Sequence, residues 1–237
     1  MTMAEEPSTA NIATNLQRTV VLGLARLQVI LMLLIFVPAG TLRFWPGWLF
    51  SMVFLASVVF LTFYFLKRDP HLIENRMKAG PGAEQQRSQK IIQAFTGALA
   101  ALLVIVPGLD HRYGWSSVPA WIVIGANALV LLGFLIIYRV FEENSFAAST
   151  IKVEAEQRVI STGPYRLVRH PMYAGGALLL LATPLALGSY WALPVAIAIT
   201  LAIVVRLLDE ERYLSVNLPG YDTYCREVRY RLIPMAW

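Results

Sequence analysis

Long apolar runs, separated by short charged segments, are the feature of this 237-residue chain that most constrains its fold. A membrane-spanning helix needs about 20 consecutive, mostly apolar residues. Four separate runs of that kind occupy residues 20–39, 45–66, 91–109 and 118–141. Hydrophobic residues make up 57% of the chain and charged residues 15%, which is too apolar for a surface exposed to water. The sequence therefore predicts an integral membrane protein with an all-α fold.

A longer stretch, residues 172–208, contains Arg206 as its only charged residue. At a rise of 1.5 Å per residue, a helix of this length would measure about 55 Å, far more than one hydrocarbon thickness. Pro184 and the pair Gly188-Ser189 lie near its middle and are typical of a turn. The stretch therefore predicts a hairpin of two spans, and the whole chain a helical bundle of about six spans.

The Lys and Arg residues between the runs are distributed very unequally. Seventeen fall in segments that would share one side of the membrane, and only Arg43 and Arg112 fall on the other. Because cytoplasmic loops are enriched in Lys and Arg, both termini and the loops 67–90 and 142–171 are expected on the cytoplasmic side of an inner or cytoplasmic-type membrane. Arg26 lies inside the first run, and we expect it to snorkel or to face the bundle.

Two functional classes receive no support from the composition. The net charge is +5, but the basic residues lie between apolar blocks and form no continuous face, so no nucleic-acid partner is expected. Cys225 is the only cysteine, and His71, His111 and His170 are the only histidines. No spaced Cys/His cluster exists, and no metal site is predicted.

Polar residues with chemical potential flank the final hairpin, in residues 163–173 (GPYRLVRHPMY) and 209–214 (DEERYL). Because a tight turn returns the chain to the same side, these segments should lie close together. Pro171 suits the first turn of a helix, which makes His170 the expected N-cap and places Tyr173 in the first turn. His170 and Tyr173 are therefore expected to face one pocket.

The acids Asp209 to Glu211 are unusual at a membrane face that favours basic residues. Arg206 could pair with Glu210 on the same helix, and Arg169 could reach the acids across the hairpin. The alternative is a solvated face with local ion pairs. The spacing alone leaves both interpretations open.

The string GPYRLVRHPMYAG, then DEERYL after a hairpin, then Gly220-Tyr221, Tyr224 and the tail RLIP, closely resembles the isoprenylcysteine carboxyl methyltransferase family of membrane enzymes. The resemblance covers residues 150–237, which suggests a catalytic region there and an N-terminal membrane region in 1–149. It implies S-adenosylmethionine as cofactor, bound by the last helices and a cytoplasmic C-terminal segment, and a small or lipophilic acceptor that enters from the bilayer. Leu218-Pro219-Gly220 departs from the family pattern, in which many relatives have Phe-Gly.

The same resemblance implies roles for six residues. Arg169 and Glu210 are expected beside the reacting group, where Arg169 would orient an anionic acceptor and Glu210 could take a proton from an amine or thiol. The expected cofactor-binding residues are Tyr165, His170, Tyr173 and Glu211, with Glu211 receiving the cofactor ammonium.

Two other functions compete with methyl transfer. Membrane sterol reductases, which use NADPH, share a similar Arg-His-Pro motif, but the acidic pair Glu210-Glu211 and the lack of a Gly-rich nucleotide motif favour a methyltransferase. A membrane protein that only binds a ligand is the other alternative. The sequence leaves open the acceptor (an isoprenylcysteine carboxylate, a thiol or a lipid amine), the methylated atom and the oligomeric state.

Overall fold

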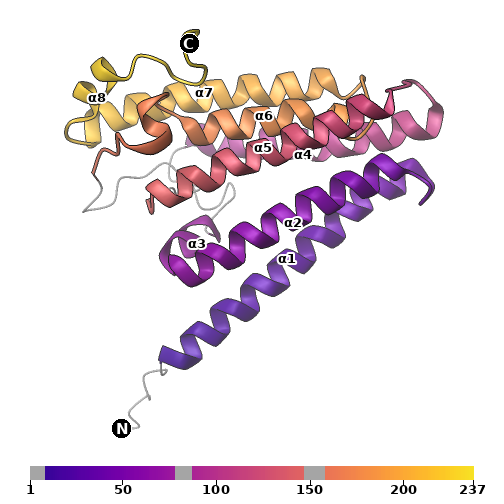
Figure 1. Cartoon of the computed structure of the whole chain (residues 1–237), viewed down its shortest axis with the longest axis horizontal. Helices are drawn as coiled ribbons and strands as arrows, with labels where there is room; N and C mark the ends of the chain where they lie inside the picture. Colours follow the sequence, from indigo (N-terminus) through magenta and orange to yellow (C-terminus); the bar gives the residue numbers. More distant parts are fainter. Residues whose placement is uncertain (1–8, 78–86, 147–157) are drawn as a thin grey trace.

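The computed structural model describes residues 9–77, 87–146 and 158–237, and in these ranges the chain forms helices and no strands (Figure 1). In chain order the helices are α1 (Thr9–Ala39), α2 (Trp45–Arg68), α3 (Pro70–Met77), α4 (Arg87–Tyr113), α5 (Ala120–Glu143), a 3₁₀ turn η1 (Gly163–Arg166), α6 (Pro171–Ala186), α7 (Leu193–Asn217) and α8 (Tyr221–Glu227).

Each apolar run of the sequence is a helix in the structure. Among the described residues, α1, α2, α4 and α5 are long and apolar enough to cross a membrane. Helix α6 is apolar but has 16 residues, and α7 has 25 residues and carries charges toward its C-terminal end. An all-helical membrane protein is thus confirmed, while the count of six spans stays a prediction.

The connections between the helices lie at two opposite ends of the molecule. The short links α1–α2, α4–α5 and α6–α7 lie at one end, and α3, η1 and α8 lie at the other (Figure 1). Exposed aromatic side chains mark the end with the short links, as Trp and Tyr do at a membrane interface. They include Trp45, Trp115, Trp121, Tyr190 and Trp191. Which end faces the cytoplasm stays a prediction.

Helices α5 and α6 pack closely because each presents a glycine to the other. A Cβ on Gly133 would lie 2.8 Å from the Gly175 carbonyl oxygen, and a Cβ on Gly175 would lie 3.0 Å from that of Gly133. Such small residues let two membrane helices approach at backbone distance. The contact fixes the first part of α6 against the middle of α5.

The expected hairpin turn is present between α6 and α7. Gly188 has a φ of +71°, which glycine adopts without strain. Ser189 is buried and its hydroxyl donates a 2.5 Å hydrogen bond to Asp110 at the end of α4. Ser116 donates to the same carboxylate from its hydroxyl and from its backbone N–H, both at 2.6 Å. This buried cluster ties the hairpin turn to α4.

Helix α3 lies in a segment that the charge pattern predicts to be a polar loop, so that prediction is wrong for residues 70–77. Asp69 accepts a 3.1 Å hydrogen bond from the Leu72 backbone N–H, and Pro70 supplies the first helical residue. Leu72 is 0% exposed, so burial of its side chain stabilises the short helix. Parts of both predicted loops, residues 78–86 and 147–157, lie outside the described residues.

Candidate active site

The segment before α6 is held by the C-terminal tail. His170 is the N-cap of α6 and Pro171 its first residue, as predicted, and the imidazole makes no capping hydrogen bond. The backbone N–H groups of Arg169 and His170 donate to the carbonyls of Tyr230 and Arg231, at 2.8 and 3.0 Å. The His170 ring is therefore free to point toward α7.

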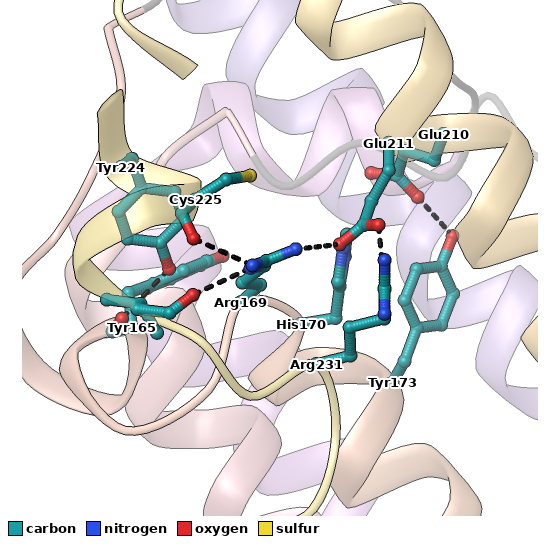
Figure 2. Close-up of polar contacts among 10 residues, drawn as sticks. Tyr165, Arg169, His170, Tyr173, Glu210, Glu211, Tyr224, Cys225 and Arg231 are labelled. Carbon is teal, nitrogen blue, oxygen red and sulfur yellow. Dashed lines mark hydrogen bonds and ion pairs between the residues drawn. The ribbon is translucent and has the colours of Figure 1, made fainter. Parts of the chain in front are cut away.

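Glu211 is the centre of the polar network (Figure 2). Its Oε1 accepts from Arg169 Nη1 at 3.2 Å and lies 3.3 Å from His170 Nε2, while its Oε2 accepts from Arg231 Nε at 2.8 Å. The Glu211 side chain is only 12% exposed. One carboxylate thus joins α7, the start of α6 and the tail.

The surroundings keep Glu211 ionised. Burial raises its pKa, but the hydrogen bonds with His170 and Arg231, reinforced by Arg169, outweigh burial and lower the pKa to about 2. Glu211 is therefore a permanent anion at any physiological pH. Most of its acceptor capacity is used, because Oε1 contacts Arg169 and His170 and Oε2 contacts Arg231.

Arg169 reaches the acids across the hairpin, as predicted, but its partner is Glu211. Besides Nη1, its Nε donates to the Val228 carbonyl and its Nη2 to the Cys225 carbonyl, both at 2.7 Å. These two bonds tie the guanidinium of Arg169 to Cys225 on α8 and to Val228, the residue that follows the helix. The contacts are those of a clamp that holds the tail.

Glu210 forms a second, separate contact with the start of α6. The Tyr173 hydroxyl donates to Glu210 Oε2 at 2.5 Å and accepts from Arg206 Nε at 3.2 Å. The Tyr173 ring also lies beside the His170 ring, with centroids 5.8 Å apart. His170 and Tyr173 therefore share one site with both carboxylates, as the sequence predicts.

Tyr165 lies apart from this group. In Figure 2 it appears with Tyr224 on one side of Arg169, whereas Tyr173 is on the other. Its hydroxyl accepts from Asn144 at 2.7 Å, and its backbone carbonyl accepts from the Tyr224 hydroxyl at 2.8 Å. Burial raises the pKa of Tyr165 to about 12, so it remains a neutral phenol. These contacts connect η1 with α5 and α8.

Arg231 is the residue of this network to which the sequence pattern assigns no role. Arg231 belongs to the RLIP string of the tail, so the motif did include it. It lies 20 positions after Glu211, however, and no helical spacing predicts that the two residues pair. The pairing of Arg231 with Glu211 depends on the backbone hydrogen bonds between the tail and residues 169–170, which the sequence pattern does not predict.

A cavity of about 540 Å³ lies on the other side of the 163–171 segment, between that segment and α5. Its wall is mainly apolar, with Leu167, Ala174 and Leu232 among the lining residues, and Arg139 and Glu142 line it on α5. Among the described residues, no group of three or more His, Cys, Asp or Glu side chains is placed to hold a metal ion.

Residues 121–218 match the family described as phospholipid methyltransferase. The C-terminal part of the chain is therefore similar to this family. The match confirms the resemblance to the isoprenylcysteine carboxyl methyltransferase type and identifies a membrane methyltransferase in general terms. A search of the curated proteins found no significant match.

The phospholipid methyltransferase match extends from α5 through α7 and includes the six predicted site residues. It begins 42 residues before Gly163, the start of the string that carries the resemblance, so the matched region includes α5. It ends at Leu218, before α8 and the tail with Arg231. Three of the five side-chain contacts of Arg169 and Glu211 described above therefore involve residues outside the match, namely Cys225, Val228 and Arg231.

Proposed function

We propose that this protein transfers a methyl group from S-adenosylmethionine to a small or lipophilic acceptor at the site between α6 and α7. The supporting observation is the convergence of the first turn of α6 on the acids of α7, with Tyr173 bonded to Glu210 and His170 beside Glu211. The family match supports the methyl-transfer chemistry, and the side chains present support the cofactor.

The residues fit a ligand that carries a cation and an aromatic base. Glu210 Oε1 accepts no hydrogen bond from the described residues, so this carboxylate is available for an ammonium group. Glu211 already contacts Arg169, His170 and Arg231, which makes Glu210 the better candidate for the ammonium and gives Glu211 the task of fixing His170 and Arg231. The rings of His170 and Tyr173 offer stacking surfaces.

Bound S-adenosylmethionine would supply a methyl group already activated on its sulfonium, so the protein needs no covalent nucleophile. The task of the residues is alignment and exclusion of water. Arg169 holds α8 and the following residues against α7, and Glu211 holds Arg231 of the tail. Both are positioning residues, which close the polar side of the site.

The acceptor follows from the same assignment. With Glu210 engaged by an ammonium and Glu211 bonded to Arg169, His170 and Arg231, the described residues of the site offer no further available carboxylate to act as a base. A carboxylate or a thiolate is nucleophilic once desolvated and requires no base, whereas an amine or a thiol must first lose a proton. We therefore favour an isoprenylcysteine-type carboxylate or a thiolate over a lipid amine.

We also propose that this site faces the cytoplasm, in a bundle of about six spans with both termini on that side. The strong bias of Lys and Arg supports this orientation. A division of the chain at residues 149 and 150 stays a prediction, and the close packing of α5 on α6 joins the two parts across it.

A methyl-transfer assay tests the proposal. Purified protein in detergent is incubated with radiolabelled S-adenosylmethionine and fractionated membrane lipids or thiols, and label is followed into the acceptor. The wild type and the control Glu227→Gln, an exposed carboxylate on α8, should transfer label. Glu210→Gln and His170→Ala should lose at least about tenfold in turnover, roughly 1.4 kcal/mol of barrier. Equal transfer by all four proteins would contradict the proposal.

A further inference from the structure

A groove of about 640 Å³ runs along α1, which lies at one edge of the bundle in Figure 1. Its lining residues lie between Gln28 and Leu42, in the half of α1 that leads to the end with the short links. Leu33 and Val37 line it and are exposed, whereas Phe36 lines it and is buried. Because α1 is long and apolar enough to cross a membrane, the groove opens toward the hydrocarbon of the bilayer.

The length of the groove corresponds to one leaflet of the bilayer. The helical part of its lining, from Gln28 to Ala39, is about 17 Å long at a rise of 1.5 Å per residue. Half of a hydrocarbon core of about 30 Å measures about 15 Å. An apolar groove of this length therefore fits one acyl chain of a lipid whose headgroup lies at the level of residues 40–42.

Two arginines lie at that end of the groove. Arg43 is exposed and directly follows Leu42, a lining residue whose carbonyl accepts a 2.8 Å hydrogen bond from Trp48 Nε1. Arg112, at the end of α4, packs on Gly40, another lining residue. A Cβ on Gly40 would lie 3.6 Å from Arg112 Nε and 3.7 Å from its Cζ. Two helices thus bring one guanidinium group each to the mouth of the same groove.

No acidic side chain neutralises these two arginines within the part of the chain that the structure describes. Arg112 contacts the ring of the residue that follows it, and neither arginine side chain has a hydrogen bond or an ion pair there. Asp110 is the only acid in the last turn of α4 or in the three short links. It is buried, and its carboxylate accepts hydrogen bonds from Ser116 and Ser189. The mouth of the groove is therefore positively charged.

We propose that this groove binds an anionic phospholipid of the surrounding leaflet, with one acyl chain along α1 and the headgroup phosphate on Arg43 and Arg112. Guanidinium groups bind phosphate through charge-assisted hydrogen bonds, which are stronger beside hydrocarbon than in water. The candidate active site lies near α8 and η1, at the opposite end of the bundle (Figure 1). The lipid in the groove is therefore a bound partner and not the methyl acceptor.

The headgroup is tested on the purified, delipidated full chain in a non-ionic detergent. Thermal unfolding is titrated with dioleoyl phosphatidylglycerol, dioleoyl phosphatidylcholine and glycerol 1-phosphate. The wild type and the control Arg68→Met, an exposed arginine at the other end of α2, should prefer phosphatidylglycerol to phosphatidylcholine by about tenfold. The double variant Arg43→Met with Arg112→Met should lose this preference.

Three results would overturn the headgroup assignment. One is a double variant that keeps the full preference for phosphatidylglycerol, and another is a wild type that has none. The third is stabilisation by glycerol 1-phosphate as strong as by phosphatidylglycerol, because the site would then bind a free phosphate compound and not a lipid.

The acyl chain is tested by filling the groove. Leu33→Trp adds bulk to a side chain that is 54% exposed in the groove, and the control Leu22→Trp adds it to one that is 60% exposed on α1 outside the groove. Native mass spectrometry should show phosphatidylglycerol bound about fivefold more weakly to Leu33→Trp and unchanged on Leu22→Trp. Equal binding by both would contradict the proposal. So would a wild-type dimer that only Leu33→Trp dissociates, since a second copy would then fill the groove.

Discussion

The single carboxylate of Glu211 connects three segments that are far apart in the sequence: α7, residues 169–170 and the tail at Arg231. Removal of that charge leaves two guanidinium groups facing each other without their shared anion. Breaking a buried ion pair in this way costs about 3 kcal/mol or more. The residue is therefore expected to matter for stability as well as for the geometry of the site.

A pH series on Glu211→Gln tests this role. A carboxylate whose folded pKa is lowered stabilises the fold above its unfolded pKa and loses this effect as the pH falls through the folded pKa. For Glu211 the loss falls between its ordinary value of 4.5 and about 2. The midpoint of thermal unfolding should be lower in Glu211→Gln than in wild type, by an amount that does not decrease between pH 7 and about pH 5. A difference that disappears above pH 5 would contradict the assignment.

Arg169→Lys separates clamping of the tail from simple charge. Lysine keeps the positive charge but cannot donate to two carbonyls and a carboxylate in the fork geometry of a guanidinium. We expect methyl transfer to fall by about tenfold or more and trypsin to cleave the tail faster. Arg139→Lys is the control, since Arg139 is 67% exposed and forms a surface ion pair with Glu142. Unchanged proteolysis of the Arg169→Lys tail would show that the clamp is dispensable.

At the scale of helices, the contact between Gly133 and Gly175 sets the distance between α5 and α6. In Gly133→Ala the new Cβ meets the backbone of α6 at 2.8 Å, so the helices must separate. Gly125→Ala on the same helix is the matched control, because a Cβ there meets nothing within 4 Å. Thermal unfolding should show a loss of about 1–3 kcal/mol for Gly133→Ala and no loss for Gly125→Ala. Equal behaviour would mean that α5 and α6 are not held by this contact.

The helices that the sequence predicted best are those formed by long apolar runs. Runs of about 20 apolar residues have few alternatives to a membrane helix. Gly188 lies in the turn of the hairpin as predicted, whereas Pro184 lies inside the last turn of α6. Helix α3 was missed because, among its described side chains, only Leu72 and Ile73 are buried, and the helix lies within a charged segment. No periodicity can be read from so short a helix.

The candidate site was predictable in its members and less so in its pairings. The motif placed His170, Tyr173, Glu210 and Glu211 together, and the structure does the same. The partner of Arg169 was left open because adjacent residues on a helix point about 100° apart, and only the packing of α7 decides that Glu211 faces it. The contact between Arg76 of α3 and Met172 of α6 was not predicted, because nothing in the sequence around Arg76 relates α3 to α6.

For the molecule as a whole, orientation in the membrane is the prediction to test first. Single cysteines at Ser117 and Tyr190, in a Cys225→Ser background, should react with an impermeant thiol reagent from outside the cell. Both residues are exposed at the end with the short links, whereas the neighbouring Ser189 is buried and unsuitable. A cysteine at Ser215, exposed on α7, should react only after lysis. The reverse pattern would invert the proposed topology.

Cofactor binding is the central claim, and calorimetry on the purified protein tests it most directly. S-adenosylhomocysteine should bind wild type with a dissociation constant of micromolar order, about 8 kcal/mol. Glu210→Gln should weaken this binding by about tenfold or more, Glu227→Gln should leave it unchanged, and NADPH should not bind. Binding of NADPH with no response to S-adenosylhomocysteine would contradict the account and favour a reductase.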